Sequence, residues 1–330
     1  MLQYIVKRVL LMIPILLAIL ILVFTISYFM PGDPVLMQMP SNFTQEQYDA
    51  KEAQLGLDKP YIVQLGNYLY NIVFHFDLGT SYNSGQSVNA FIGGRIWVTF
   101  KIGLLSCFVT LLIALPVGII SAVRQYSALD YIATTCAIFL AAMPGFWLAL
   151  MLIILFSQML QILPASGLHS WKHYILPVVC NALAPLAQIT RMTRSSMLEV
   201  IRQDYIRTAR SKGIKESAII FKHALKNAMI PIITVASVQF SHIIGGSVIV
   251  ENIFSIPGMG SALVNAIGNR DYPCIMGITF LISIFVCVIN MVVDILYTVV
   301  DPRMKAQIFG VKKKKKEKEP APAVKEAATS

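Results

Sequence analysis

Six long apolar runs alternate with polar segments along this chain of 330 residues. An α-helix needs about 20 apolar residues to cross the hydrocarbon core of a bilayer, so each run predicts one transmembrane helix. This pattern predicts an all-α integral membrane protein. The six predicted spans are residues 9–29, 99–123, 131–159, 174–190, 229–250 and 274–300.

Prolines interrupt several of these runs. A membrane helix tolerates proline where neighbouring helices satisfy the freed carbonyl groups, so kinked helices packed in a bundle are expected. The fourth run, 174–190, contains two prolines and is the weakest of the six. The first run, 9–29, is too long for a signal-peptide core and lacks a cleavage site of small residues, so it predicts a retained span. The prolines concerned are Pro14, Pro116, Pro144, Pro177 and Pro185.

Composition and charge support a membrane protein and set its orientation. Hydrophobic residues make up 56% of the chain and charged residues 13%, whereas soluble domains average about 45–50% and 25%, which argues against a soluble enzyme. With the N-terminus in the cytoplasm, 21 of the 27 Lys and Arg residues fall on the inner side. Cytoplasmic loops carry such an excess, so both termini are predicted to be cytoplasmic. The net charge of +10 therefore reflects membrane topology and not nucleic-acid binding.

Two polar segments are predicted on the outer side. Segment 30–98 holds six acidic and three basic residues with many turn signals, and it predicts a small extracytoplasmic cap that contains some helix. Segment 251–273 contains Gly258 and Gly260, which indicate a tight turn before a short amphipathic stretch at 262–267.

The cytoplasmic segment 191–228 carries the most informative pattern. Ile201, Tyr205 and Ala209 recur at four-residue spacing and predict an amphipathic helix, and Gly213 follows where a left-handed residue would end it. A second helix is predicted from Ile214, Ala218, Phe221 and Leu225. The two helices would either lie on anionic lipid or form a docking surface for a cytosolic protein. The small residues Ala209 and Gly213 would let such a protein approach closely.

The sequence lacks the usual motifs of catalysis and nucleotide binding. It has no GxxxxGK[ST] phosphate loop, no HExxH motif and no GxSxG motif, so no nucleotide, metal or catalytic site is predicted in this chain. The five cysteines lie in or beside apolar runs and indicate small core residues. His242 is expected to face the bundle interior. Asp294 is expected to pair with Arg191 or Arg194.

The chain ends in a basic tail. Five consecutive lysines occupy 312–316, and the residues after them have a disordered composition. The lysines are either solvated on the cytoplasmic side or bound to anionic lipid. The predicted organisation is a first span (1–29), a cap (30–98), a transmembrane core (99–305) that includes the cytoplasmic loop, and a tail (306–330).

Segments of loop 191–231 resemble a known family. RMTRSSMLE (191–199), DYIRTARSKG (204–213) and HALKNAMIP (223–231) are similar to the EAA loop of bacterial binding-protein-dependent ABC importers, in the first permease subunit of the dipeptide, oligopeptide and nickel branch. Arg207-Thr208-Ala209 stands where Glu-Ala-Ala is typical, a variant usual in this branch. The resemblance covers about 1–305. Further segments in family order are PGDP (31–34), LGLDKP (55–60), FDLG (76–79), ENIF (251–254), PG (257–258), DYP (271–273), DILY (294–297) and DPR (301–303).

The resemblance implies a six-helix permease of the type I importer fold in the bacterial cytoplasmic (inner) membrane. It implies a second homologous permease, two cytosolic ATPases that bind ATP and Mg, an extracytoplasmic binding protein that delivers peptide, and transport by rocking of the two permeases. This chain would hold no cofactor and would not be an enzyme.

Three sets of site residues follow from this resemblance. The ATPase-coupling residues are Glu199, Asp204, Tyr205, Arg207, Thr208, Ala209, Arg210, Lys212 and Gly213. The residues expected to dock the binding protein are Asp33, Asp58, Asp77, Pro257, Gly258 and Asp271. The residues expected along the translocation path are His242 and Gln239.

Three alternatives remain at this point. Within the family, the substrate could be nickel or glutathione in place of a dipeptide or oligopeptide. A secondary transporter would need symmetric discontinuous helices or a buried charge relay, and the sequence offers neither convincingly. A membrane anchor would have no reason to carry a helix–glycine–helix loop.

Overall fold

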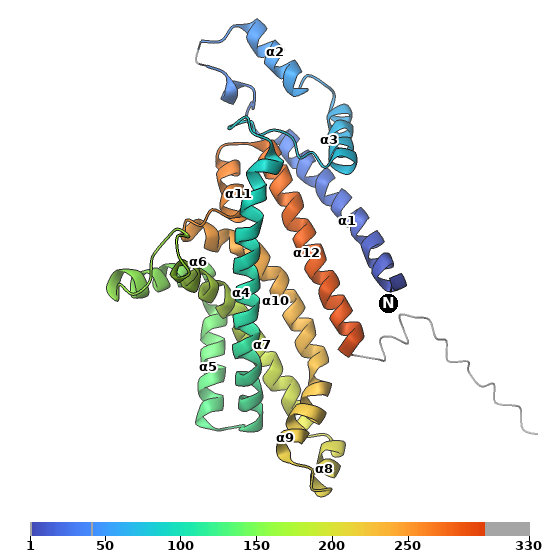
Figure 1. The fold of residues 1–330 in the computed structure, drawn as a ribbon, viewed down its shortest axis with the longest axis vertical. Helices are drawn as coiled ribbons and strands as arrows, with labels where there is room; N and C mark the ends of the chain where they lie inside the picture. The colour runs from blue at the N-terminus through green and yellow to red at the C-terminus, as the bar shows by residue number, and fades with distance from the viewer. Residues whose placement is uncertain (1, 41, 301–330) are drawn as a thin grey trace, which may run out of the picture.

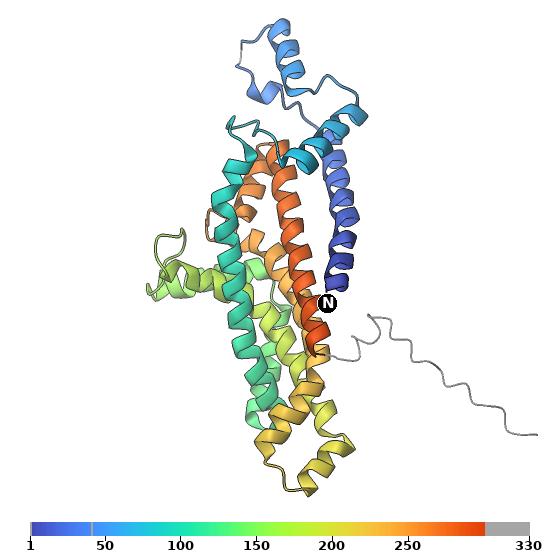
Figure 2. The same ribbon diagram turned by 45° about the vertical axis from the view of Figure 1, so that its right-hand side comes forward.

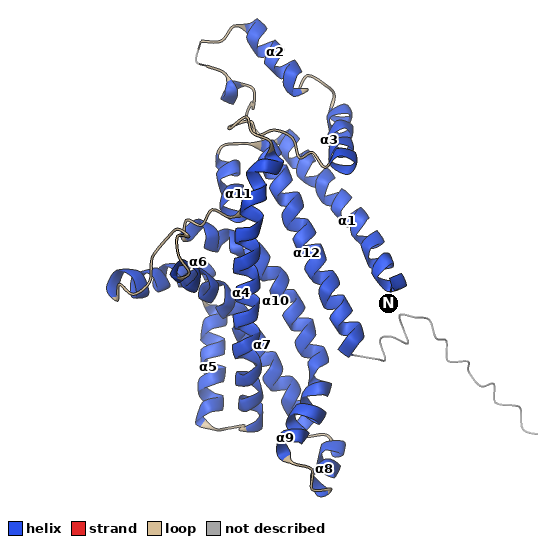
Figure 3. Cartoon of the chain, in the orientation of Figure 1, coloured by secondary structure: helices blue, strands red, loops and turns tan. Residues whose placement is uncertain are grey.

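Helices form nearly all regular structure in the part of the chain that the computed structural model describes, residues 2–40 and 42–300 (Figure 3). Within these residues, pairing of the β type is confined to one isolated bridge between Thr80 and Ser87. The prediction of an all-α fold is confirmed. The basic tail 306–330, with its lysine run, lies outside the described residues.

The described helices supply five or six membrane spans, depending on whether one bent pair counts as a span. The bent pair is α5 (Ala128–Ala142) and α6 (Gly145–Leu152), which continues as π-helical η2 (Ile153–Met159). Four of the straight candidates lie in α1 (Leu2–Phe29), α4 (Val88–Val123), α7 (Lys172–Ile201) and α12 (Tyr272–Val300). The fifth, Glu216–Ile243, runs from α9 (Glu216–Ala218) through η3 (Ile219–Ala224) into α10 (Leu225–Ile253).

The third predicted span is not one helix. The two halves of 131–159 meet at 108°, with the break between Ala142 and Gly145. Pro144 follows Met143, whose extended backbone (ψ 131°) is the conformation that a residue before proline prefers. The prolines inside α1, α4, α7 and α10 leave those helices continuous, so Pro144 acts as a helix break and not as the predicted kink.

Two predicted spans belong to helices that are longer than predicted. Helix α4 starts at Val88 and not at 99, and its 36 residues span about 54 Å, well beyond the thickness of a hydrocarbon core. Helix α7 runs on to Ile201, so Arg191 and Arg194 continue the fourth span and do not open a loop. The cap therefore ends near residue 87, and the connection that was predicted to be cytoplasmic is shorter than expected.

The helix–glycine–helix prediction for the cytoplasmic loop is partly wrong. The chain bends at Gln203, which has an extended backbone (ψ 147°), so Ile201 ends α7 while Tyr205 and Ala209 belong to the separate helix α8 (Asp204–Ser211). The second predicted helix does not lie free on the surface, because α9 (Glu216–Ala218) and π-helical η3 (Ile219–Ala224) lead directly into α10.

The centre of the bundle is the long contact between α4 and α7. Gly118 of α4 lies so close to α7 that an added Cβ would be 2.8 Å from the carbonyl oxygen of Thr190. Ser106 and Thr110 donate hydrogen bonds to α7 carbonyl oxygens at 3.3 Å. Small and hydroxyl-bearing residues are typical of helix contacts within membranes.

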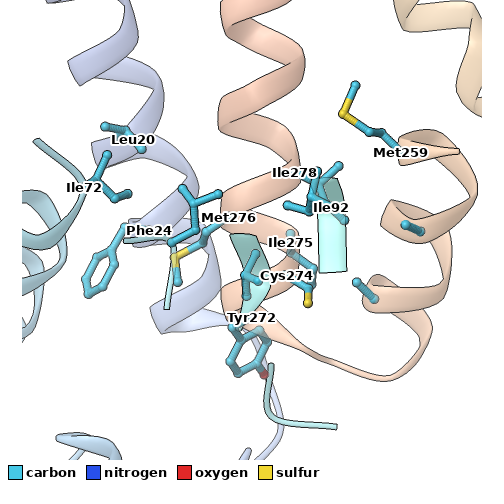
Figure 4. Packing of buried hydrophobic residues seen from close by; sticks show 14 residues of the cluster. Leu20, Phe24, Ile72, Ile92, Met259, Tyr272, Cys274, Ile275, Met276 and Ile278 are labelled. Atoms are coloured by element: carbon cyan, nitrogen blue, oxygen red, sulfur yellow. The ribbon is translucent and has the colours of Figure 1, made fainter. Parts of the chain in front are cut away.

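A second packing centre joins the ends of several helices that lie nearest the cap (Figure 4). Leu20 and Phe24 of α1 and Ile72 of α3 (Tyr61–His75) lie toward Met276 and its neighbours on α12. Met259 of α11 (Met259–Gly268) approaches from the other side. This cluster fixes the cap, which also contains η1 (Leu36–Gln38) and α2 (Gln45–Leu55), to the end of the bundle.

Helices α1 and α12 lie beside each other in both ribbon views (Figures 1 and 2). Arg8 Nη1 of α1 lies 2.9 Å from Asp294 Oδ2 of α12. The prediction that Asp294 pairs with Arg191 or Arg194 is therefore wrong. Sequence separation hid this pair, because the two helices are far apart in the chain and adjacent only in space.

The prediction for the cysteines holds in part. Cys180 and Cys274 are buried, and Cys107 and Cys287 are half-buried, as expected of small core residues. Cys136 is exposed on α5, so it is not a core residue.

Candidate functional site

Helix α8 lies at the end of the molecule opposite the cap (Figure 1). Ile206 and Ala209, three residues apart on one face, are buried. They belong to an apolar cluster with Met197 of α7 and Ile219 of η3. This face fixes α8 to its own chain, and the remaining surface of the helix faces outward.

The small side chain of Ala209 serves this internal packing. It is 9% exposed and lies in the cluster that joins α8 to α7 and η3. It therefore does not offer the open surface that the sequence predicted for a partner protein. Gly213 does, because it is exposed and nothing lies within 4 Å of an added Cβ.

The end of α8 has the predicted glycine geometry. Gly213 adopts a left-handed backbone (φ 74°). Its N–H donates to the carbonyl of Arg210 at 2.9 Å, and the N–H of Ile214 donates to the carbonyl of Ala209 at 3.3 Å. This is the Schellman arrangement, in which glycine is favoured because other residues pay a steric cost there.

An ion pair closes the turn after α8. Arg210 Nη2 lies 2.6 Å from Glu216 Oε1, and its Nε donates to Oε2 at 3.2 Å. The pair joins the last turn of α8 to α9, although exposed pairs of this kind contribute only about 0–1 kcal/mol to stability.

The outward face of this region is polar and exposed. Tyr205 accepts a hydrogen bond from Asn227 Nδ2 at 3.0 Å, and Thr208 donates to the carbonyl of Asp204 at 3.0 Å. Glu199 is exposed on α7, one turn before the bend. Such a surface can form ion pairs and hydrogen bonds with another protein. Its exposed members on and after α8 are Asp204, Tyr205, Arg207, Thr208, Arg210, Lys212 and Gly213.

A pocket of about 350 Å³ lies beside the break between α5 and α6. Both residues predicted for the translocation path, Gln239 and His242 of α10, line it. Asn181 and Gln188 of α7 line it as well, and Asn181 Nδ2 donates to the carbonyl of Ile243 at 3.2 Å. Three amide side chains and one imidazole supply hydrogen-bonding groups to this wall, and its lining residues include no Asp, Glu, Lys or Arg.

The acidic residues of the cap differ in their surroundings. Asp33 is half-buried and accepts hydrogen bonds from the Tyr48 hydroxyl at 2.6 Å and the Val35 N–H at 2.8 Å. The hydrogen bond to Asp33 raises the pKa of Tyr48 to about 12. Asp58 and Asp77 are exposed and are available to a partner on this face.

The turn at Gly258 packs against Glu251 and joins α10 to α11. Glu251 of α10 is fully buried and accepts hydrogen bonds from the Thr99 hydroxyl at 2.7 Å and the Gly260 N–H at 2.6 Å. A Cβ on Gly258 would lie 2.3 Å from a Glu251 oxygen. Gly258 is therefore buried against its own chain and not part of a docking surface, whereas Pro257 is exposed.

Asp271 is also an internal residue. It is 4% exposed, and its carboxylate accepts hydrogen bonds from the Ser81 hydroxyl and from the Tyr82 N–H at 3.0 Å. These bonds tie the segment before α4 to the start of α12. Burial removes Asp271 from the surface that was predicted to dock a binding protein.

The sequence patterns missed two buried carboxylates. Glu251 belongs to the segment predicted on the outer side, and Asp130 lies at the edge of the third apolar run. Asp130 accepts hydrogen bonds from Arg194 Nε at 2.5 Å and Nη2 at 2.8 Å, so Arg194 pairs with Asp130 and not with Asp294. The sequence does contain a signal for such residues, namely a carboxylate at the edge of an apolar run. An unpaired carboxylate is costly in that position, so it predicts a hydrogen-bonding partner.

Two family models together match most of the chain. The model described as "Binding-protein-dependent transport system inner membrane component" matches residues 114–306, and its N-terminal companion matches 1–103. The first therefore covers the candidate sites on α7, α8 and α10, and the second covers the cap.

Curated relatives resemble the chain over nearly its whole length. The oligopeptide transport system permease protein AppB of Bacillus subtilis is 41% identical over 312 residues, which are 91% of this chain and 98% of that protein. A putative peptide transport system permease protein of Brucella abortus is 40% identical over 309 residues, with the same coverage. The glutathione transport system permease protein GsiC of Pectobacterium atrosepticum is 38% identical over 305 residues, 92% of this chain and 99% of that protein.

The fold also resembles that of a solved importer. The MetNI methionine ABC transporter in an inward-facing conformation matches with a TM-score of 0.53 at 18% identity, over 64% of this chain and 96% of the other. The predicted importer permease fold is thereby confirmed, and the family is one of transport subunits and not of catalytic ones. This chain belongs to the binding-protein-dependent transport system inner membrane components, the multi-pass permeases of ABC importers.

Proposed function

We propose that this chain is one of two homologous permeases in an ATP-driven importer of dipeptides or oligopeptides. The observation that carries the substrate class is the set of relatives named as peptide and oligopeptide permeases, at 40% and 41% identity over 91% of the chain. Two cytosolic ATPases bind ATP and Mg and supply the energy, because this sequence has no phosphate loop. An extracytoplasmic binding protein delivers the peptide.

In this proposal α8 is the contact with the ATPase. The buried face of α8 packs against α7 and η3. A displacement of α8 by an ATPase bound to its polar face would therefore move the end of the bundle and not α8 alone. Arg207 and Thr208 lie at the centre of that polar face. The cap lies at the opposite end of the molecule (Figure 1), which suits a binding protein that docks on the other side of the membrane.

On the outer side, the docking proposal keeps Asp58, Asp77 and Pro257, which are exposed, and the half-buried Asp33. Gly258 and Asp271 contribute by holding the outer turns in place. The pocket at His242 and Gln239 is proposed as part of the peptide path. Its amide groups can pair with peptide N–H and C=O groups of any sequence, which suits a permease whose selectivity is left to the binding protein.

Transport by the complete complex tests this function. The two permeases, the ATPases and the binding protein are reconstituted in vesicles, and uptake of a radiolabelled dipeptide, a longer peptide, glutathione and nickel is measured with and without ATP. Uptake of the dipeptide or the longer peptide that requires both ATP and the binding protein is expected. Uptake of nickel alone would contradict a peptide substrate, and uptake without ATP would contradict an ABC importer.

Glutathione is the second candidate substrate. The relative GsiC of Pectobacterium atrosepticum is named for glutathione transport and is 38% identical to this chain, close to the value for the peptide permeases. Competition decides between them: if the system prefers glutathione, unlabelled glutathione halves the uptake of labelled dipeptide at a lower concentration than unlabelled dipeptide does.

A further inference from the structure

Two side-chain links join the turn between α4 and α5 to the end of α7. Arg194 of α7 binds both carboxylate oxygens of Asp130 on α5, at 2.5 and 2.8 Å. Arg202, in the bend before α8, donates to Gln125 Oε1 at 3.1 Å. The α4–α5 turn and the start of α5 are therefore bonded to α7 at one position and to the bend before α8 at another.

The Asp130 link is buried and fully hydrogen-bonded. Asp130 is 2% exposed, and besides Arg194 its carboxylate accepts from the Ser121 hydroxyl and from the Tyr126 N–H at 3.0 Å. A bidentate guanidinium–carboxylate pair restricts both distance and rotation between its helices. Removing one partner leaves a buried charge without compensation, so the two helices are expected to stay together when either is moved.

Helix α5 connects this link to the pocket. From Asp130 it runs to Ala142, where the chain breaks by 108° before α6. Ala141 and Gly145, on either side of the break, line the 350 Å³ pocket together with residues of α7 and α10. Movement of α5 as a rigid helix would therefore be taken up at the break and would reshape the wall of the pocket.

We infer that the Arg194–Asp130 pair transmits displacement of α8 to the α5–α6 break, so that ATPase closure opens or closes the pocket. The inner ends of α4, α5 and α7 move as one body with α8, and the hinge is the segment between Ala142 and Gly145. Arg194 and Asp130 are positioning residues in this scheme and do not touch the peptide. The inference rests on the proposed function of α8 as the ATPase contact.

The first test compares transport with ATP hydrolysis in the reconstituted complex. In Asp130→Asn, ATP hydrolysis stays within twofold of wild type, whereas peptide uptake per ATP falls about tenfold, within the roughly 5- to 150-fold range of typical coupling free energies. Arg194→Lys keeps the charge without the bidentate geometry and gives an intermediate loss. Asp49→Asn, at an exposed carboxylate of α2, is the matched control and keeps wild-type coupling.

A purely structural pair gives a different result. Hydrolysis, uptake and assembly of the complex then fall in parallel in Asp130→Asn, and that outcome overturns the inference. Unchanged uptake per ATP overturns it as well. If the wild-type complex itself shows no ATP-driven uptake, the proposed function fails before any variant is compared, so the two failures are distinguishable.

A second measurement leaves the Arg194–Asp130 pair intact, so it does not depend on whether variants of the pair fold. Spin labels are placed at Arg124→Cys, in the α4–α5 turn, and Lys215→Cys, after α8, with the exposed native Cys136 replaced by serine. Both positions are exposed. The distance between them is expected to stay constant when the complex binds ATP, while the distance from Arg124→Cys to a label at Asn269→Cys, beyond α11, changes. A change in the first distance overturns the rigid-body claim.

Discussion

Single buried carboxylates hold the corners of this bundle. Glu251 joins α10 to α4 and α11, Asp271 joins α12 to the segment before α4, and Asp130 joins α5 to α4 and α7. A buried carboxylate is costly unless donors surround it, so each of them is stable in only one arrangement of its neighbours. These residues therefore specify geometry more than they add stability.

The Glu251 corner allows a test at this scale. A Cβ on Gly260 would lie 2.4 Å from the Cα of Val248, which is backbone and cannot move aside, whereas a Cβ on Gly268 of the same helix meets nothing within 4 Å. We expect Gly260→Ala to destabilise the protein by about 1–3 kcal/mol, as overpacking does. The thermal unfolding midpoint in detergent measures this loss.

Gly268→Ala is the control for that variant and is expected to change the midpoint little. Equal midpoints for the two variants would contradict the close approach of α11 to α10.

At the scale of elements, α8 combines two faces with different roles. Ile206 is fully buried against α7 and η3, while its neighbour Arg207 is exposed. The helix has eight residues and would be marginal alone, because isolated helices shorter than about 12–15 residues rarely form in water. Its structure therefore depends on the apolar contact, and its polar face is left for a partner.

Substitutions on the two faces should separate these roles. Ile206→Ala is expected to cost about 2–5 kcal/mol of stability, as a cavity in a core does, and to lower the amount of folded protein in the membrane. Arg207→Ala is expected to leave folding unchanged and to reduce ATP-driven uptake in the reconstituted complex.

Size-exclusion profiles and uptake are measured for both variants, with the exposed Lys222→Ala of η3 as the control. If Arg207→Ala transports as well as wild type, α8 does not contact the ATPase through this face.

At the scale of the whole molecule, the chain places its cap and α8 at opposite ends of a bundle of long apolar helices (Figure 1). Basic residues are concentrated at the α8 end, which the positive-inside rule assigns to the cytoplasm. Helix α1 is little buried, because only 11% of its most apolar stretch is buried inside the molecule. Its surface suits contact with lipid or with a second permease.

This orientation is tested by labelling from one side. In intact cells, a membrane-impermeant thiol reagent is expected to modify Asn83→Cys, in the exposed turn before α4, and not Lys215→Cys, after α8. Both are built in a chain with Cys136 replaced by serine. Labelling of Lys215→Cys from outside would place α8 on the wrong side for an ATPase and would end the coupling proposal.

The sequence alone determined the fold class and the family, because apolar runs and the motifs of the loop around Gly213 are local in the chain. The cytoplasmic contact around Gly213 stays a prediction. The tertiary structure decided which of the predicted residues are exposed and can contact a partner protein. Ala209, Gly258 and Asp271 were predicted to meet partners, and each is buried against its own chain.

The pairings, too, required the folded molecule. Asp294 meets Arg8 and Asp130 meets Arg194 because helices distant in sequence lie side by side, a relation that periodicity along one helix cannot contain. The break at Pro144 follows the same logic, since five other prolines sit within unbroken helices. The presence of a proline alone therefore does not decide whether a helix continues: at Pro144 the break coincides with the extended backbone of Met143.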